Sequence, residues 1–481
     1  MNMRKTKIVC TLGPSVDSEE MLRKLILAGM NCARFNFSHG THETQLSTLT
    51  KLKRARDELG RPVATMLDTK GPEIRVKTFQ NGPVTLTEGG QFTLTTRDVA
   101  GDDGQVSVTY TNLHQEVEPG TRILIDDGLI ELKVVCVEGQ EIRCTVVTGG
   151  TLSNNKSINI PDTKIQLPAL TDKDREDLRF AAENDFDFVA ASFIRKASDI
   201  EDIRAELAKW GGENIRIIAK IENREGVDNF DEILSASDGA MVARGDLGVE
   251  IPAYEVPIIQ KEMISKSAAA GKNVVTATQM LDSMIRNPRP TRAEISDVAN
   301  AVFDGTSCVM LSGETASGKY PIEALETMVK TVLAAESAIN YWGRFIKNYS
   351  LSATGSSASI NQAISHTCCS TAMDLNADAI LAATTSGHTA RVISRFRPPC
   401  PIVALTTSEK CRRQLAISWG VQPLLYGSVD STDRLFSLCV DTARKEGLVK
   451  PGNTVVITAG VPLSAKGTTN LIKAQVVDEP L

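Results

Sequence analysis

Short apolar runs rich in β-forming residues alternate with longer segments of helical period, and this alternation constrains the fold more than any other feature. Strands that alternate with helices are typical of βαβ units on a parallel sheet. Eight strand–helix pairs predict an α/β fold, a TIM (β/α)8 barrel. The eight runs cover residues 7–12, 32–38, 63–69, 186–193, 215–221, 240–247, 274–278 and 308–312.

Helical segments separate most of these runs. Apolar residues recur with a period near 3.6 at 18–28, 174–184 and 256–270, where we expect helices. Short polar residues before such segments can cap the first turn of a helix. The predicted capping residues are Asp17, Thr171 and Ser198.

The third and fourth runs are too far apart for one barrel unit. About a hundred residues separate them, whereas a unit takes roughly thirty. From about Gly71 to Leu167 the chain changes to short runs rich in Val, Ile and Thr with turns such as Asn81-Gly82, which favour antiparallel strands. We therefore predict a small inserted β-barrel domain at 71–167, emerging from the catalytic face of the barrel.

A second α/β domain is expected after the barrel. The barrel itself is assigned to 1–70 and 168–347, ending in a long helix at 322–346. A polar stretch at 350–359 is a candidate linker. The C-terminal domain, 348–481, is predicted from a helix at 360–375, strands at 379–383, 402–406 and 454–458, and a helix after Gly387.

Composition excludes several classes of function. Lys and Arg number 53 and Asp and Glu 59, a formal net charge of −6, which disfavours a nucleic-acid surface. No apolar run approaches the ~18 residues of a membrane helix, and no signal sequence is recognised. The ten cysteines form no Cys-x-x-Cys pair. We expect a cytoplasmic protein without nucleic-acid or membrane partners.

Polar side chains recur where the predicted strands end. In barrel enzymes the catalytic groups collect at these carboxyl ends. Each residue alone has the alternative interpretation of a solvated loop residue, but recurrence in unit after unit favours a site. The residues are Arg34, Asn36 and Ser38; Asp68, Thr69 and Lys70; Ser192 and Arg195; Lys220 and Glu222; Asp246; Thr278; and Ser312 with Glu314.

Lys220 and Glu222 are two residues apart in a strand and therefore face the same side. A buried ion pair is the simplest interpretation of the two. It leaves unexplained why Asp246, after the next strand, adds a second carboxylate. Two carboxylates completed by substrate oxygens are the usual way in which proteins hold Mg²⁺.

Seven segments together resemble the pyruvate kinase family. The resemblance covers nearly the whole chain and implies transfer of the phosphoryl group of phosphoenolpyruvate to ADP, giving ATP and, after protonation of the enolate, pyruvate, in the last step of glycolysis. Such chemistry needs charge neutralisation and positioning more than covalent help. The segments are 31–40, 68–75, 220–223, 241–248, 277–280, 290–294 and 310–315.

The resemblance also implies roles for individual residues. Lys220 and Arg34 would contact the transferring phosphoryl group, and Gly245, Asp246 and Thr278 would hold the substrate. Glu222 and Asp246 would bind Mg²⁺ or Mn²⁺. A potassium site would be formed by Asn36, Ser38, Asp68 and Thr69, and the glutamate at Glu73 accompanies K⁺ dependence in the family; for Asn36 and Ser38 the alternative is a simple turn. The implied nucleotide-binding residues are Asn36, Phe37, Ser38, His39, Arg75 and Lys156, the last on a lid domain.

The resemblance also implies how the enolate is protonated and how the enzyme is regulated. Thr278 and Ser312, with Glu314 behind, would order a proton relay, unless Ser312 and Glu314 only support their loop. The segment with Thr384, Thr385, Ser386, Gly387 and Thr389, beside the loop 461–469, would bind a phosphorylated allosteric effector at a helix start, although a plain helix cap is the alternative. A homotetramer is implied by analogy. The rival functions are a metal-dependent phosphoenolpyruvate or pyruvate lyase and an inactive effector-binding protein; dependence on ADP separates the kinase from the lyase.

Overall fold

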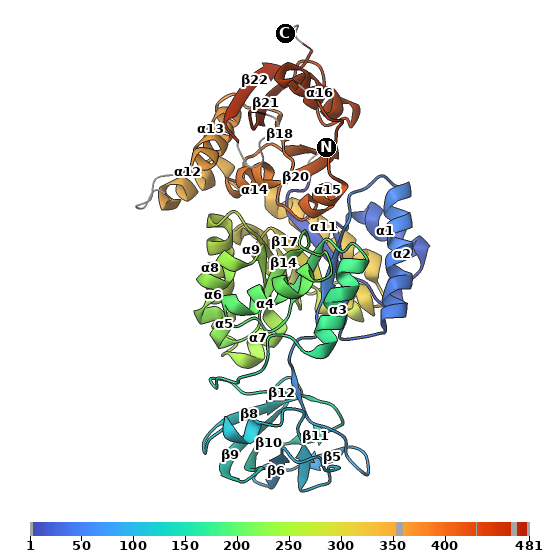
Figure 1. The fold of residues 1–481 in the computed structure, drawn as a ribbon, viewed down its shortest axis with the longest axis vertical. Coiled ribbons are helices and arrows are strands. Elements are labelled where there is room, and N and C mark those ends of the chain that lie inside the picture. The colour runs from blue at the N-terminus through green and yellow to red at the C-terminus, as the bar shows by residue number, and fades with distance from the viewer. Residues whose placement is uncertain (1–2, 353–358, 430, 463–468, 479–481) are drawn as a thin grey trace.

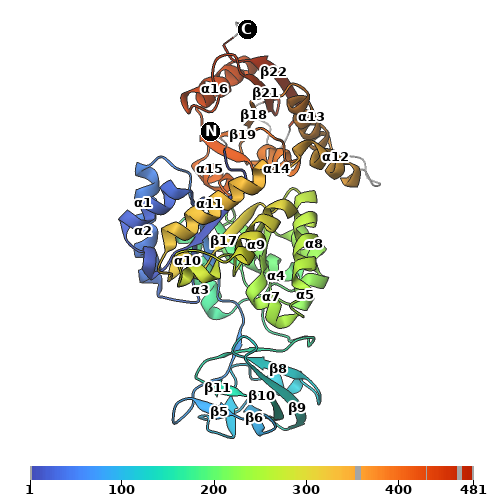
Figure 2. The same cartoon turned by 180° about the vertical axis from the view of Figure 1, so that it is seen from behind.

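The computed structural model describes residues 3–352, 359–429, 431–462 and 469–478, with side chains described to residue 346 in the first range. Three lobes are stacked along the long axis, and the barrel lies between the inserted β domain and the C-terminal α/β domain in both views (Figures 1 and 2). The middle lobe is the predicted closed barrel of parallel strands. Its strands, in spatial order, are β1 (Lys7–Thr11), β2 (Cys32–Asn36), β3 (Ala64–Asp68), β13 (Phe188–Ala191), β14 (Arg216–Ile221), β15 (Gly239–Ala243), β16 (Asn273–Ala277) and β17 (Cys308–Leu311).

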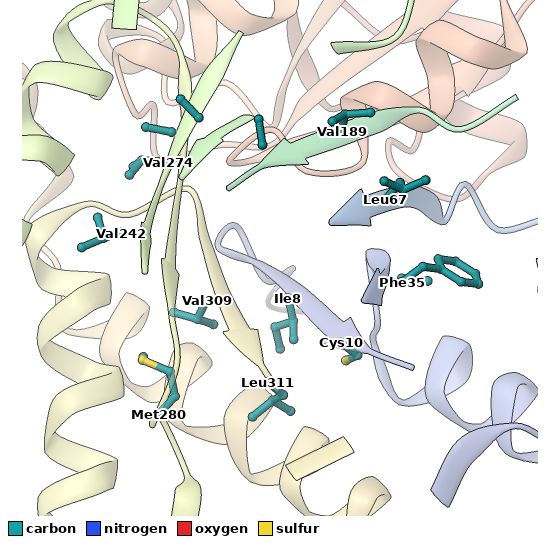
Figure 3. Packing of buried hydrophobic residues seen from close by; sticks show 14 of the residues in the cluster. Ile8, Cys10, Phe35, Leu67, Val189, Val242, Val274, Met280, Val309 and Leu311 are labelled. Atoms are coloured by element: carbon teal, nitrogen blue, oxygen red, sulfur yellow. The ribbon is translucent and has the colours of Figure 1, made fainter. Parts of the chain in front are cut away.

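The barrel strands are buried on both faces, as expected for parallel strands under helices. On β1, Ile8 and Cys10 pack in the cluster between strands and helices (Figure 3). Val9, between them, belongs instead to the cluster inside the barrel, together with Met66 and Ile218. The period of two therefore decides which residues of each strand line the interior.

Helices cover the outside of the barrel. Ser18 caps α1 and Thr171 forms a capping box at the start of α3, as predicted for Thr171. The predictions for Asp17 and Ser198 are wrong: Asp17 precedes the cap, and α4 already begins at Ala197. The helices are α1 (Glu19–Ala28), α2 (His42–Glu58), α3 (Asp172–Glu183), α4 (Ala197–Ala208), α5 (Arg224–Asp228), α6 (Phe230–Ala236), α7 (Arg244–Glu250), α8 (Val256–Ala269), α9 (Arg292–Asp304), α10 (Gly313–Ala316) and α11 (Pro321–Ser337).

Two further boundaries differ from the sequence prediction. The sixth strand ends at Ala243, so Asp246 lies in the first turn of α7 and not at a strand end. The long helix expected at 322–346 is two helices, because α11 ends at Ser337 and α12 (Tyr341–Ser352) starts afresh. The side chain of Asn340 accepts a hydrogen bond from the Gly343 amide at 2.9 Å. An asparagine that binds nearby backbone in this way favours a new helix start over continuation.

The inserted domain is a strongly curved β sheet. Its main sheet has the order β4-β12-β8-β9-β10-β6-β7, and the isolated bridge between Val76 and Val108 joins the two edges. The prediction of antiparallel pairing is wrong for one pair, since β6 and β7 run parallel. The strands are β4 (Ile74–Arg75), β5 (Val84–Leu86), β6 (Gln91–Thr95), β7 (Gln105–Ser107), β8 (Arg122–Ile125), β9 (Ile130–Glu138), β10 (Glu141–Thr148), β11 (Gly150–Leu152) and β12 (Ser157–Asn159).

The C-terminal domain is a five-stranded sheet of order β20-β19-β18-β21-β22 with helices on both faces. The predicted strands at 379–383 and 402–406 have those bounds, whereas β20 and the antiparallel edge strand β22 were not predicted. Most of the predicted linker, 353–358, lies outside the described residues. The elements are α13 (Ile360–Asp374), β18 (Ala379–Ala383), α14 (His388–Arg395), β19 (Ile402–Thr406), α15 (Glu409–Leu415), β20 (Val421–Leu425), α16 (Thr432–Lys445), β21 (Thr454–Ala459) and β22 (Leu471–Val476).

This domain closes the amino-terminal end of the barrel. Ala416 and Ile417, which follow α15, belong to the cluster that fills the barrel interior. The opposite, carboxyl-terminal end of the strands faces the inserted domain (Figure 1). Within the part of the chain that the structure describes, no helix is both long enough and apolar enough to cross a membrane.

Candidate active site

The last inward-facing layer at the carboxyl end of the barrel is polar. Each member of this layer lies two residues beyond an apolar residue of the barrel interior, because side chains alternate along a strand. The pairs are Cys32 and Arg34, Met66 and Asp68, Ala190 and Ser192, and Ile218 and Lys220. These polar residues line one cavity of about 580 Å³ together with Glu222 and Asp246.

Lys220 is at the centre of this layer. Its ammonium nitrogen lies 2.9 Å from a Glu222 oxygen, 3.0 Å from an Asp68 oxygen and 2.7 Å from the Ser192 hydroxyl. Burial alone would lower the pKa of Lys220, but the negative charges of Asp68 and Glu222 outweigh it and raise that pKa above the usual value. The lysine is therefore a permanent cation at neutral pH.

Asp68 connects two cations. One carboxylate oxygen accepts a hydrogen bond from the Arg34 Nε at 2.5 Å, and the other accepts from Lys220. Although burial opposes ionisation, Arg34 and Lys220 together hold the pKa of Asp68 below its usual value. Arg34 also donates to the Thr11 hydroxyl at 3.0 Å. The guanidinium is thus fixed at the cavity wall.

Glu222 and Asp246 are the candidate Mg²⁺ ligands. Burial raises the pKa of Glu222 to about 7, the Asp246 charge adds to this effect, and Lys220 opposes it. A bound divalent cation would relieve this excess of negative charge. Among the described residues no group of three or more Asp, Glu, His or Cys side chains is arranged to hold a metal. Two carboxylates fit Mg²⁺, which is usually shared between a protein and substrate phosphate oxygens.

Gly245, in the first turn of α7, is in contact with Thr278, which follows β16. The Gly245 amide donates to the Thr278 hydroxyl at 2.7 Å. Thr278 has a backbone φ of 66°, which is uncommon for a β-branched residue. Arg244 stabilises this conformation, because its guanidinium donates to the carbonyl oxygens of Thr278 at 2.6 Å and of Ala277 at 3.1 Å.

The four residues of the predicted potassium site lie at the ends of β2 and β3. Asn36, Ser38 and Asp68 line the cavity, and Thr69 is buried beside it. The Asn36 side-chain oxygen accepts from the Ser38 amide at 3.1 Å, which is the turn considered as the alternative interpretation. The Thr69 carbonyl accepts from the Ser192 hydroxyl at 2.6 Å.

The predicted nucleotide-binding cations are both paired inside the chain. Arg75 donates to Glu73 at 2.7 Å, and Lys156 donates to Asp126 at 2.8 Å. His39 lines the same cavity as Arg75. Phe37 differs from this set, since its ring is 2% exposed and packs in the aromatic core of the barrel. Its side chain is therefore not available to a nucleotide.

Ser312 and Glu314 lie beside Gly245 and Thr278 in a neighbouring cavity of about 830 Å³. The Glu314 carboxylate accepts from the Leu281 amide at 3.0 Å and from the Ser312 amide at 2.7 Å. Glu314 thus supports this loop, as the alternative interpretation stated. The Ser312 hydroxyl is buried and has no hydrogen-bond partner among the described residues.

The predicted effector segment lies at the start of α14. The Thr384 hydroxyl accepts from the Gly387 amide at 3.0 Å, and the Thr389 hydroxyl is 2.7 Å from that of Thr469. Thr385 and Ser386 are exposed. Most of the loop 461–469 that was expected beside this segment lies outside the described residues.

Three features of the site were missed. Ser192 was noted at a strand end without a role, yet its hydroxyl contacts Lys220. The Phe193 amide donates to the Glu222 carboxylate at 2.6 Å, a main-chain contact that no side-chain pattern indicates. Arg244 stands in the segment 241–248 that carried the family resemblance, and its position there was the available signal.

A parallel barrel whose mouth combines a buried ammonium, an arginine and two carboxylates defines an enzyme that acts on an anionic substrate with the help of a metal. The family model described as the pyruvate kinase barrel domain matches residues 3–325, and the model described as the pyruvate kinase alpha/beta domain matches 362–475. The chain therefore belongs to the pyruvate kinase family, a family of phosphotransferase enzymes.

Known relatives agree with this assignment over the full length. A pyruvate kinase of Clostridium acetobutylicum is 50% identical over 477 residues, covering 99% of this chain and 100% of the relative. That of Geobacillus stearothermophilus is 50% identical over 480 residues, covering 99% of this chain and 81% of the relative. The crystal structure of a Cryptosporidium parvum pyruvate kinase matches with a TM-score of 0.94 and 40% identity, covering 98% of this chain and 96% of that one. The lyase alternative is not favoured.

Proposed function

We propose that this enzyme transfers the phosphoryl group of phosphoenolpyruvate to ADP, with Mg²⁺ and K⁺ as cofactors. The observation that carries the proposal is the buried Lys220 ammonium, within 3.0 Å of both Asp68 and Glu222 at the mouth of the barrel. A migrating phosphoryl group is stabilised by fixed positive charge in a pocket of low dielectric constant.

In the reaction, the bond between phosphorus and the enol oxygen breaks and a bond to a β-phosphate oxygen of ADP forms. Lys220 and Arg34 neutralise the oxygens of the group in transit. The Gly245 amide, Thr278 and Asp246 orient the substrate. The enolate that is left takes a proton at its methylene carbon, and ATP and pyruvate are released.

Mg²⁺, or Mn²⁺ in its place, would be held by Glu222 and Asp246, and would supply charge neutralisation between the phosphates. Two features support this assignment: both carboxylates line the cavity that contains Lys220, and the pKa of Glu222 is raised by burial and by the charge of Asp246.

K⁺ would be held by oxygens of Asn36, Ser38, Asp68 and Thr69. Asn36, Ser38 and Asp68 line the cavity. The Thr69 carbonyl accepts a hydrogen bond from Ser192, which also lines the cavity. Glu73 accompanies this requirement by the family resemblance. A lysine at this position would itself supply a positive charge, whereas Glu73 supplies none and is paired with Arg75.

ADP would be bound by Arg75 and Lys156, beside the backbone of residues 36–39 and the side chains of Asn36, Ser38 and His39. In binding, each of the two cations would exchange its carboxylate partner, Glu73 or Asp126, for phosphate oxygens. Lys156 lies in the inserted domain, which would act as a lid that excludes water from the transfer.

The proton for the enolate would arrive through Thr278 and Ser312. A hydroxyl is a weak acid near neutral pH, so the two would order a water chain and not donate unaided. The buried Ser312 hydroxyl, which has no partner within the described ranges, supports this assignment because it is available to bind such a water.

Regulation would involve a phosphorylated effector bound by 384–389 at the start of α14. The exposed Thr385 and Ser386 support this assignment. We further propose a homotetramer in the cytoplasm, in keeping with the family.

A coupled assay tests the reaction. Pyruvate release from phosphoenolpyruvate is measured with lactate dehydrogenase, with and without ADP, Mg²⁺ and K⁺. We expect release only with ADP and Mg²⁺, and a strong increase with K⁺. Release without ADP would favour the lyase, and equal rates in sodium and potassium would contradict the potassium site.

A further inference from the structure

Ser192 and Phe193 form a turn that contacts the centre of the site from the end of β13. The Ser192 hydroxyl is 2.7 Å from the Lys220 ammonium, and the Phe193 amide donates to Glu222. Phe193 has a φ of 57°, in the left-handed region that costs most residues energy. Strain of this kind persists only where the surroundings enforce the conformation.

Gly71, the first residue of the inserted domain, packs directly against this turn. A Cβ at Gly71 would lie 2.8 Å from the Ser192 Cβ and 2.9 Å from the Phe193 ring. Both distances are shorter than van der Waals contact, so the turn is packed directly against the main chain where the insert begins. Ser192 itself is 4% exposed.

Donor chemistry and distance together assign the hydrogen bonds of the Ser192 hydroxyl. The ammonium of Lys220 can only donate, so the hydroxyl oxygen is its acceptor. The single hydroxyl proton then has two candidate acceptors, the Thr69 carbonyl at 2.6 Å and an Asp68 oxygen at 3.3 Å. The shorter contact identifies the Thr69 carbonyl as the acceptor.

Ser192 also fixes the other oxygen of Thr69. The Ser192 amide donates to the Thr69 hydroxyl at 3.1 Å. Ser192 therefore orients both oxygens of Thr69. Its hydroxyl is also one of the three groups that the Lys220 ammonium contacts. Asp68 and Thr69 are two of the four residues that we propose as ligands of the potassium ion.

We propose that Ser192 is a positioning residue that couples the monovalent-cation site to Lys220. Its hydroxyl holds the Thr69 carbonyl toward the cation and the Lys220 ammonium toward the transferring phosphoryl group, so occupancy of one site fixes the geometry of the other. This inference rests on the proposed function and extends it.

The test compares Ser192→Ala with the wild type in the coupled assay, with KCl varied and ionic strength held constant by tetramethylammonium chloride. We expect kcat at saturating K⁺ to fall about ten- to a hundredfold and the half-saturating K⁺ concentration to rise roughly tenfold, since hydrogen bonds to a charged group and to a cation ligand are lost together. The KM for phosphoenolpyruvate at saturating K⁺ should change less than kcat.

Two further variants complete the test. Ser192→Thr keeps the hydroxyl, and its half-saturating K⁺ concentration is expected within about threefold of the wild type. Ser267→Ala in α8 makes the same substitution at a buried serine whose hydroxyl has no hydrogen-bond partner among the described residues, and should change neither quantity. The half-saturating concentration does not depend on how much of a sample is folded, so a loss of yield does not obscure the result.

The outcomes separate the inference from the proposed function. A wild type that needs ADP and K⁺, with a Ser192→Ala variant whose half-saturating K⁺ is unchanged, overturns the inference alone. A wild-type rate that does not depend on the K⁺ concentration overturns the potassium site and the inference with it. A rise in half-saturating K⁺ that Ser192→Thr reverses supports the coupling.

Discussion

The two ends of the barrel differ in how their charged side chains are placed. At the carboxyl end, Lys220 faces Asp68 and Glu222 in an open cavity, and Glu222 has a pKa raised to about 7. At the amino end, Arg413 of the C-terminal domain pairs with the buried Asp187 at 2.8 Å and with Asp185 at 2.7 Å, and Ile417 seals the interior.

Positive backbone φ values, in contrast, occur at both ends. They are found at Phe193 and Thr278 at the carboxyl end and at Asp185 and Arg397 at the amino end. At the amino end, Lys7 donates to the Val421 carbonyl at 2.6 Å and Arg397 to the Gly305 carbonyl at 2.9 Å, so that these two buried side chains bind backbone of the other domain. The carboxyl end keeps unbalanced charge for ligands, whereas the amino end uses its charges to join two domains.

The largest expected effect concerns the carboxyl end. Lys220→Met should lower kcat by about a hundred- to ten-thousandfold, ~3–5 kcal/mol, because the fixed charge facing the phosphoryl group is lost. Steady-state kinetics in the coupled assay measures this. Lys209→Met, at an exposed lysine of the same barrel, is the control and should leave kcat unchanged. More than a tenth of the wild-type rate in Lys220→Met would mean that the catalytic role is misassigned.

At the amino end, the loss of a buried cation should reduce stability and leave kcat unchanged. Arg413→Ala leaves Asp187 buried without its cation, which costs about 3 kcal/mol in the free energy of unfolding. Burial already raises the pKa of Asp187. Without Arg413 this folded-state pKa rises further above the unfolded value, so stability is lost as pH rises between the two values.

Urea unfolding at pH 5 and pH 8 checks this prediction. The loss in Arg413→Ala should be larger at pH 8, where Asp187 must ionise in a buried site without its arginine partner. An equal loss at both pH values would show that Asp187 is not the group left uncompensated. A variant with normal stability and a lowered kcat would break the contrast between the two ends.

Metal binding should depend on pH because of Glu222. A protonated Glu222 does not ligate a cation, and its pKa is raised to about 7. Below that pH the apparent affinity for Mg²⁺ or Mn²⁺, measured by calorimetry without substrates, should fall by up to about tenfold per pH unit, and above it the affinity should level off. Glu222→Gln should bind weakly at every pH. A constant wild-type affinity between pH 5.5 and 8 would contradict the assignment.

The smallest expected effect tests the apolar seal at the amino end. Ile417→Val removes one methylene group from a side chain that is 0% exposed, which should cost about 1 kcal/mol in the free energy of unfolding. Urea unfolding and kcat are measured together, with Ile258→Val at an exposed position as the control. An unchanged stability would mean that the seal contributes little to domain docking.

The sequence predicted most of the fold because apolar periods record which faces are buried. Seven of the eight barrel strands end within two residues of their predicted ends. The sixth strand is predicted to end at residue 247 but ends four residues earlier, at 243. The error arose because the buried Leu247 extends the apolar pattern of the strand into the short helix α7. The break between α11 and α12 escaped prediction, since it depends on one side-chain cap by Asn340.

The candidate site was predicted in part for a similar reason. Lys220, Asp68 and Arg34 could be grouped from the sequence because each follows an inward-facing strand position. The positive φ of Phe193 and the contacts of Ser192 could not, because they arise from packing against Gly71, more than a hundred residues away along the chain.

By itself the sequence determined the barrel, its two additional domains and the chemical types of side chain at the mouth, since alternation and periodicity are local properties of the chain. Only the tertiary structure decided which of these charges meet. Whether a lysine faces one carboxylate or two, and whether a hydroxyl donates to Thr69 or to Asp68, depends on distances of a few tenths of an ångström between strands that are joined along the chain by a helix or by the inserted domain. Those distances are set by close packing across the barrel, which no local pattern encodes.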